Sequence, residues 1–289
     1  MYDLVRAETK DGLLLRGLYV PGDKNKPAVI HIHGFQGDFF TQEFPKKIAE
    51  KLHENNLAFI AVQNRGTGVE SEIYTTTTKG WAAGGASFEL LEEAYMDIDA
   101  WIKFLIDEGY KDIILQGHSL GTMKVVRYLF EGKRVDKVSK LILLAPFDIM
   151  QLFEDATKGK GKEYLGIAEQ KVKDGRGKEI IPEHFLDAKM SYQTYVSHHK
   201  QDDFEYMFAV HNTSYGFPLL NKINIPVKII VGTSDPYFNP ANPGNPKEAL
   251  DLLLKNIKKS EGKLIEGAKH GYEGYEDIVA EEVLNFVNS

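Results

Sequence analysis

Short apolar segments recur along the chain and are separated by amphipathic stretches. The segments in the middle of the chain, such as "AVIHI", "DIILQ" and "VKIIV", are almost continuously apolar and rich in β-branched residues. That pattern is typical of parallel strands covered on both faces. The predicted strands fall within residues 13–20, 28–34, 57–66, 112–117, 140–146, 227–232 and 263–268. The first alternates with Arg16 and follows the turn "KDG", which predicts an N-terminal antiparallel hairpin.

Helical periodicity fills the gaps between these strands. Phe44, Ile48 and Leu52 recur at i, i+4 and i+8 in "FPKKIAEKLHENN", and a longer helix is predicted from Ser87 to Gly109. Further helices are predicted in "LGTMKVVRYLFEGK" and in "YEDIVAEEVLNFV". Alternating strands and helices indicate βαβ units, and therefore an α/β fold with a mostly parallel, doubly wound sheet of about eight strands.

The alternation stops between residues 147 and 218. This stretch is polar and aromatic, and it contains no apolar segment comparable with the predicted strands. Because a structureless loop of that length is unusual in a compact domain, we expect a mostly helical cap inserted after the sixth strand. The predicted organisation is a core of residues 1–146 and 219–289 with a cap of residues 147–218. The run "TTTT" at 75–78 is expected to be a surface loop.

Composition narrows the possible partners. The 289-residue chain has a net charge of −7, so neither nucleic acid nor an anionic membrane is an expected partner. Its N-terminus lacks the layout of a signal peptide, and no apolar run reaches the roughly 18 residues of a membrane span. The absence of cysteine excludes disulfides, thiolate metal sites and a cysteine nucleophile. A cytoplasmic protein without a metal or other cofactor is expected, and the oligomeric state is not predicted.

The pentapeptide "GHSLG" at 117–121 lies between a predicted strand and a predicted helix. It has two interpretations: a tight turn whose serine caps the helix, or a nucleophile elbow that presents Ser119 above the sheet. The second requires a base, an acid and two N–H donors at the carboxyl ends of neighbouring strands.

Candidates for each role stand at those strand ends. Asp235 follows "VKIIVG", and His270 follows the last predicted strand, which gives the chain order Ser, Asp, His. The N–H donors would be Phe35, in "HGFQG", and Leu120, at the start of the helix after the serine. Asp148, after "LLAP", is the alternative acid. The coincidence of these elements favours Ser119 as a nucleophile.

The other histidines have competing interpretations. His31 and His33 lie on the same face of a strand and could bind a metal, but the interpretation favoured here is that His33 braces the loop that follows it. His118 is expected to fill space beneath the elbow. Three of the histidines in the insertion are expected at the surface or within the cap: His198, His199 and His211.

These landmarks resemble the α/β-hydrolase superfamily over nearly the whole chain. "HIHGFQG", "NRGTG", "GHSLG", "VGTSDP" and "AKHGY" match its successive motifs. The layout is similar to serine carboxylesterases, including feruloyl and cinnamoyl esterases. The resemblance implies a triad of Ser119, Asp235 and His270 with backbone donors at Phe35 and Leu120.

A serine at this position favours acyl transfer, and so the expected substrate is a small ester with an apolar or aryl acyl group. Cap aromatics such as Tyr192, Phe204 and Phe208 are expected to influence which acyl group is accepted. A peptidase or amidase is the alternative; the insertion has four acidic residues that could bind a substrate amine: Glu154, Asp202, Asp203 and Glu205. A receptor or scaffold without turnover is a third possibility.

Overall fold

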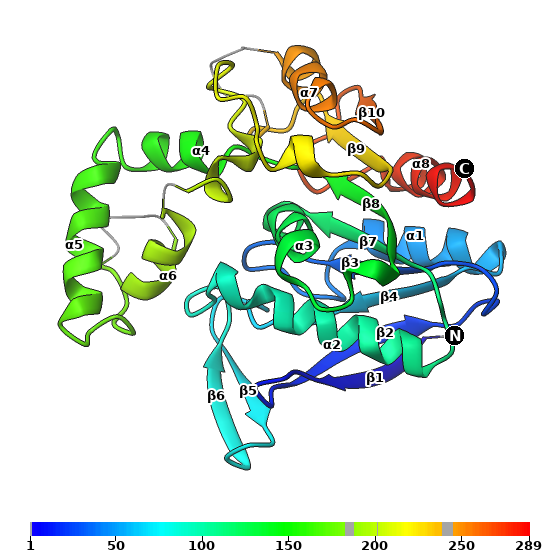
Figure 1. Cartoon of the computed structure of the whole chain (residues 1–289), viewed down its shortest axis with the longest axis horizontal. Coiled ribbons are helices and arrows are strands. Elements are labelled where there is room, and N and C mark those ends of the chain that lie inside the picture. The colour runs from blue at the N-terminus through cyan, green and yellow to red at the C-terminus, as the bar shows by residue number, and fades with distance from the viewer. Residues whose placement is uncertain (1, 183–187, 201, 239–244) are drawn as a thin grey trace.

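The computed structural model describes residues 2–182, 188–200, 202–238 and 245–289. The strands of its main sheet are β1 (Asp3–Glu8), β2 (Leu14–Val20), β3 (Ala28–Ile32), β4 (Ala58–Val62), β7 (Ile113–His118), β8 (Val138–Leu144), β9 (Val227–Gly232) and β10 (Ser260–Ile265). They are ordered β1-β2-β4-β3-β7-β8-β9-β10, and the sheet twists through the centre of the molecule (Figure 1).

Only the N-terminal end of this sheet is antiparallel. β1 pairs with β2 and β2 pairs with β4 in antiparallel register, whereas every later neighbour is parallel. β3, β4 and β7 are buried along their whole lengths, because helices cover both faces of the sheet. The predicted fold, including the N-terminal antiparallel hairpin, is confirmed.

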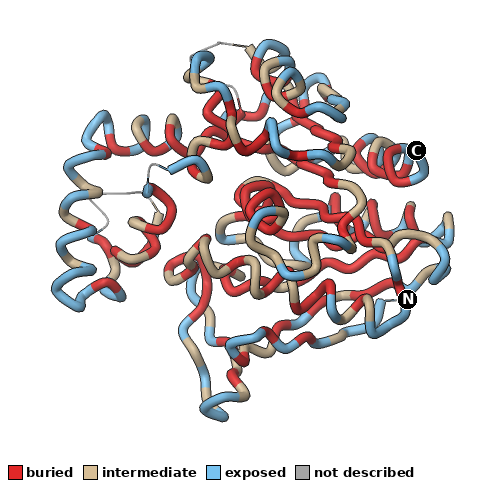
Figure 2. Tube along the Cα trace, viewed as in Figure 1, coloured by how far each residue is buried: buried red, intermediate tan, exposed pale blue. Residues whose placement is uncertain are grey.

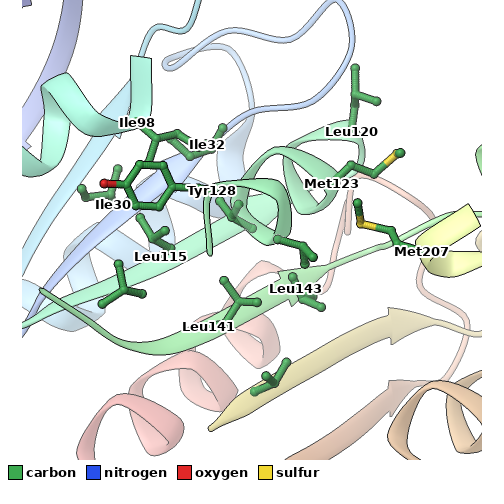
Figure 3. Close-up of a cluster of buried hydrophobic side chains, with 14 of the residues drawn as sticks. Ile30, Ile32, Ile98, Leu115, Leu120, Met123, Tyr128, Leu141, Leu143 and Met207 are labelled. Atoms are coloured by element: carbon green, nitrogen blue, oxygen red, sulfur yellow. The ribbon is translucent and has the colours of Figure 1, made fainter. Parts of the chain in front are cut away.

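Five helices form the two outer layers. They are α1 (Glu43–Glu54), α2 (Ala94–Asp107), α3 (Leu120–Glu131), α7 (Pro246–Lys255) and α8 (Glu276–Asn288). Side chains of α1 and α8 share one apolar cluster with the sheet, and those of α2, α3 and α7 share another on the opposite face. Figure 3 shows the second cluster, in which Ile98 and Tyr128 from the helices meet Ile30 and Leu115 from the strands.

The segment between β8 and β9 has helices and 3₁₀ turns as its described regular elements, as predicted, apart from one isolated bridge between Ile180 and Ser191. It contains α4 (Ile149–Ala156), α5 (Gly161–Lys173), α6 (Tyr192–His198), and the 3₁₀ turns η3 (Glu205–Phe208) and η4 (Leu220–Lys222). α4, α5 and α6 lie to one side of the sheet (Figure 1), and much of the outer surface of α5 is exposed (Figure 2).

Buried apolar side chains of this insertion belong to two different hydrophobic clusters. Phe153, Ala168 and Tyr195 belong to a small cluster of its own, whereas Phe147 and Phe208 pack into the main core beneath it. The helical part of the insertion is therefore anchored at its two ends by the core. The boundaries at residues 147 and 218 stay a prediction.

Two local features differ from the sequence-based expectation. The first is a second, two-stranded sheet of β5 (Ser71–Thr75) and β6 (Gly80–Gly84), whose five-residue strands gave no clear periodicity. The "TTTT" run forms the end of β5 and the turn that follows it. The second is the start of α2 at Ala94, after a 3₁₀ turn η1 (Leu91–Glu93), instead of at Ser87. The backbone oxygen of Ser87 instead accepts a hydrogen bond from Ser191 N of the insertion at 2.8 Å.

A further 3₁₀ turn, η2 (Val135–Lys137), leads into β8. None of the helices within the described ranges combines the length and the apolar character that a membrane span needs.

Candidate active site

Ser119 occupies a strained turn between β7 and α3. Its backbone has φ 55° and ψ −125°, a conformation that non-glycine residues rarely adopt. The turn is tight because α3 begins against the end of β3: a Cβ on Gly121 would lie 2.2 Å from the backbone oxygen of Ile32. The glycine after the serine is therefore required by close packing, and the geometry is that of an elbow instead of an ordinary capped turn.

His270 and Asp235 meet beside this elbow. His270 Nδ1 lies 2.8 Å from Asp235 Oδ2, and Asp235, which follows β9, is 2% exposed. The other carboxylate oxygen, Oδ1, accepts a hydrogen bond from Tyr237 N at 2.9 Å. These contacts fix the carboxylate and leave His270 Nε2 as the ring atom available to a serine.

Asp148, the alternative acid, lies in a different environment. It caps the N-terminus of α4 by accepting from Gln151 N, and its Oδ2 contacts Nδ1 of His211 at 2.5 Å. Side-chain hydrogen bonding to Asp148 raises the pKa of His211. Asp235, and not Asp148, is therefore the acid in contact with His270.

Ser119 and His270 line one cavity of about 550 Å³. These two described residues form no hydrogen bond to each other in this structure. Such contacts are often long in the absence of a substrate and tighten when a ligand binds. The cavity therefore brings the serine and the imidazole to one space, and Asp235 contacts the imidazole through Nδ1 without being among the described lining residues.

The predicted N–H donors lie at the same point. A Cβ on Gly34 would be 2.7 Å from Ser119 Cβ and 3.1 Å from Leu120 N, so only a glycine lets the loop after β3 approach the elbow. Within the described chain, neither the Phe35 nor the Leu120 amide donates a backbone hydrogen bond. Phe35 and Leu120 both line the cavity. The two amides are therefore available to a ligand beside Ser119.

Histidines support this arrangement from below. His33 donates from Nδ1 to Gly34 O at 2.9 Å and contacts Thr67 Oγ1 through Nε2 at 2.8 Å, which confirms the predicted brace. His118 Nε2 lies 2.8 Å from His270 O, a contact that sequence reasoning did not find. Burial, and then the neighbouring His270, lowers the pKa of His118, so its ring is neutral and can hold the His270 backbone.

The His31 and His33 rings make separate contacts. His31 Nδ1 lies 2.8 Å from Gln116 Nε2, whereas His33 binds the loop described above. In the part of the chain that the structure describes, no group of three or more His, Asp or Glu side chains is arranged to hold a metal.

A buried ion pair behind the elbow was also missed. Lys124 Nζ lies 2.5 Å from Glu89 Oε1, and both side chains are fully buried. Lys124 also donates to Asn64 Oδ1 at 3.3 Å, and Asn64 Nδ2 donates to His33 O at 3.3 Å. In the sequence, Lys124 is a lysine on the apolar side of a predicted helix. Helical periodicity alone does not show whether such a lysine is buried or exposed to solvent.

The walls of the cavity are mainly apolar. Apolar side chains from the loop after β3, from α4 and from the segment before α6 line it: Phe35, Phe147, Ile149, Leu152, Phe153 and Met190. His198 and His199, predicted as surface or cap residues, also line it. Tyr192, Phe204 and Phe208 are not among the described lining residues, because they pack elsewhere in the cap and core. Their expected influence on which acyl group is accepted stays a prediction.

Solved structures with the same fold support the architecture. Est1E from Butyrivibrio proteoclasticus with ferulic acid bound is 20% identical, with a TM-score of 0.64 over 98% of this chain and 97% of that one. The α/β hydrolase GrgF from Penicillium sp. sh18 is 16% identical, with a TM-score of 0.70 over 99% and 98%. The esterase Pf2001 of Pyrococcus furiosus is 18% identical, with a TM-score of 0.61 over 100% and 91%.

No curated protein matches the sequence. A family described as "Protein of unknown function (DUF1749)" matches residues 19–209, about two thirds of the chain. The chain therefore belongs to the DUF1749 family, and its fold is that of the α/β hydrolases.

Proposed function

We propose that the protein is a serine hydrolase that cleaves small carboxylic esters through an acyl-enzyme. The observation that carries this proposal is the shared cavity, in which the strained Ser119 lies beside His270 while His270 Nδ1 contacts Asp235 at 2.8 Å. Acyl transfer through a serine requires all three of these features: an accessible serine nucleophile, an oriented imidazole base and free backbone amides that stabilise an oxyanion.

Each group has one role in the proposed reaction. Asp235 accepts from His270 Nδ1–H, so Nε2 is unprotonated and takes the Ser119 proton as Oγ attacks the ester carbonyl. The amides of Phe35 and Leu120, with the N-terminus of α3, stabilise the negative oxygen. His270 then protonates the departing alcohol. Water, deprotonated by the same imidazole, releases the acid from Ser119.

The composition of the cavity favours esters over peptides. Its described walls are apolar apart from glutamines, histidines, the serine and a tyrosine, and they include no aspartate or glutamate. Glu154, Asp202, Asp203 and Glu205, the residues considered for binding a substrate amine, do not line it. The cavity therefore suits an uncharged substrate with an apolar or aryl acyl group.

Rapid mixing with 4-nitrophenyl acetate tests the proposal. We expect a burst of about one equivalent of 4-nitrophenol followed by slower turnover, because acylation precedes hydrolysis of the acyl-enzyme. Ser119→Ala should give no burst. Faster cleavage of the matched 4-nitroanilide would favour an amidase, and saturable binding of esters without any release of 4-nitrophenol would favour a receptor.

A further inference from the structure

Two consecutive histidines at the end of α6 form part of the cavity wall. His198 is the last residue of the helix and His199 is its C-cap; they are 3% and 5% exposed. Both line the cavity that contains Ser119. Buried histidines in a mainly apolar wall need hydrogen-bond partners, and the mechanism proposed above does not use either ring.

The hydrogen-bonding capacity of His199 is fixed by its neighbours. Its Nδ1 lies 2.7 Å from Tyr195 O, which can only accept, so the ring proton is on Nδ1. Burial lowers the pKa of His199 to about 3, so the ring is neutral and Nε2 carries a lone pair. The ring also stacks on Phe153 with centroids 3.6 Å apart, which holds its orientation. His199 Nε2 is therefore a positioned acceptor.

His198 has a polar atom without a partner. Its Nε2 is buried and hydrogen-bonds to no residue that the structure describes. Burial, then His199 and Lys124, lower the pKa of His198, so this ring is neutral as well. Its ring centroid is 6.0 Å from that of Phe35, whose backbone amide is a proposed oxyanion donor. The His198 ring therefore lies beside the side chain of the residue that carries this amide, and it has a polar atom that no described residue pairs.

We propose that His198 and His199 form a polar subsite that binds a hydroxyl group of the substrate. The hydroxyl donates to His199 Nε2, and His198 supplies the second polar contact. Neutral rings offer no charge to a carboxylate, whereas a positioned acceptor selects for a donor. The inference rests on the proposed function, because it treats the cavity as a substrate site. The hydroxyl can belong to the acyl or to the alcohol part of the ester.

Two matched pairs of esters show whether the hydroxyl belongs to the acyl part or to the alcohol part of the substrate. The acyl pair is 4-nitrophenyl 3-(4-hydroxyphenyl)propanoate and its 3-phenylpropanoate analogue; the alcohol pair is 4-hydroxybenzyl acetate and benzyl acetate. We expect at least a tenfold higher kcat/KM for the hydroxylated member of one pair. His199→Leu should bring that ratio close to one, whereas His199→Gln, which retains an acceptor, should preserve part of it. His53→Leu, an exposed histidine of α1, is the matched control and should keep the wild-type ratio.

Wild-type ratios near one in both pairs, or a ratio unchanged in a folded His199→Leu variant, would overturn the subsite. Direct binding separates this failure from failure of the proposed function. Calorimetry with Ser119→Ala measures the affinity for alcohols that cannot be hydrolysed. It compares 3-(4-hydroxyphenyl)propanol with 3-phenylpropanol, and 4-hydroxybenzyl alcohol with benzyl alcohol. Tighter binding of a hydroxylated alcohol without ester hydrolysis would reject the enzyme and keep the subsite. Hydrolysis with no hydroxyl preference in rate or binding would reject the subsite and keep the enzyme.

Discussion

Two regions contribute to the same cavity in different ways. One is the carboxyl-terminal edge of the sheet, formed by the loops that follow β3, β7, β9 and β10 and called the sheet edge below; the other is the helical insertion beside it. At the sheet edge, β3, β7 and β9 are buried throughout, and Ser119 and Asp235 follow directly from them. In the insertion, α5 and α6 pack around a small cluster of their own, and α5 has only two buried residues. The sheet edge therefore holds groups in fixed positions, whereas the insertion supplies walls.

This difference suggests a division of labour. Reacting groups need positions fixed to fractions of an ångström, which buried parallel strands and tight glycine turns provide. Specificity requires side chains of suitable size and polarity, which the insertion presents from α4 and α6. Substitutions in the two regions should therefore differ in kind: loss of rate at the sheet edge, and altered substrate ranking in the insertion.

The largest effect is expected from Ser119→Ala at the sheet edge. Loss of a triad nucleophile costs on the order of 10⁶ in kcat in the subtilisin series. The change removes one oxygen, so the melting temperature should stay close to that of the wild type. Steady-state hydrolysis of 4-nitrophenyl acetate measures the loss, and activity within tenfold of the wild type would exclude Ser119 as the nucleophile.

A smaller loss is expected from Asp235→Asn. The amide keeps the shape of the carboxylate but favours the wrong imidazole tautomer, and the matching change in a serine protease lowers kcat by about 10⁴. Asp148→Asn is the matched control, since that aspartate contacts His211 instead of His270. Measurements of kcat for both variants should show a large loss only for Asp235→Asn, and the reverse pattern would place the acid one strand earlier.

In the insertion, Leu152→Ala should change substrate ranking. Leu152 lines the cavity and is 37% exposed, so its truncation should cost little stability. Loss of apolar contact is worth about 1–3 kcal/mol for each methylene, which predicts a shift of roughly tenfold in the preference for butyrate over acetate esters. Val172→Ala, at an exposed position of α5 outside the described cavity wall, should leave the preference unchanged. Equal preferences in the wild type and Leu152→Ala would remove α4 from the substrate site.

The two regions can also be compared by their response to acid. Burial lowers the pKa of His31 in β3 and of His199 beside α6 to about 3, against about 6.5 in the unfolded chain. The unfolded state therefore binds protons first, so the stability that each ring contributes is present above pH 6.5 and is lost as the pH falls toward 3. Each should reduce the free energy of unfolding by about 1.4 kcal/mol for each pH unit below 6.5.

Urea titrations between pH 6 and pH 4.5 measure this slope. His31→Gln and His199→Gln should each make it shallower by about the same amount if both regions unfold together. A shallower slope for His31→Gln alone would show that the insertion opens before the core, and would sharpen the distinction between the two regions.

Sequence patterns predicted the sheet edge far better than the insertion. The strands before Ser119 and Asp235 are nearly continuous apolar runs, whereas the strand before His270 is a more polar one at the side of the sheet. Loops at the carboxyl ends of parallel strands meet at one edge, so topology alone brings the three residues together. His198 and His199 gave no such signal, because their burial depends on how α6 packs against Phe35 and Phe153. The Lys124–Glu89 pair was likewise invisible, since the partners are 35 positions apart and neither is typical of a core.

Covalent labelling tests most directly the claim that the sheet edge alone carries the chemistry. A small fluorophosphonate is added to the wild-type protein, and the adduct is located by mass spectrometry of the peptides. One adduct per chain, on Ser119, is predicted, with labelling strongly slowed in His270→Ala and absent in folded Ser119→Ala. An adduct on a residue of the insertion, or none on the folded wild-type protein, would contradict the account.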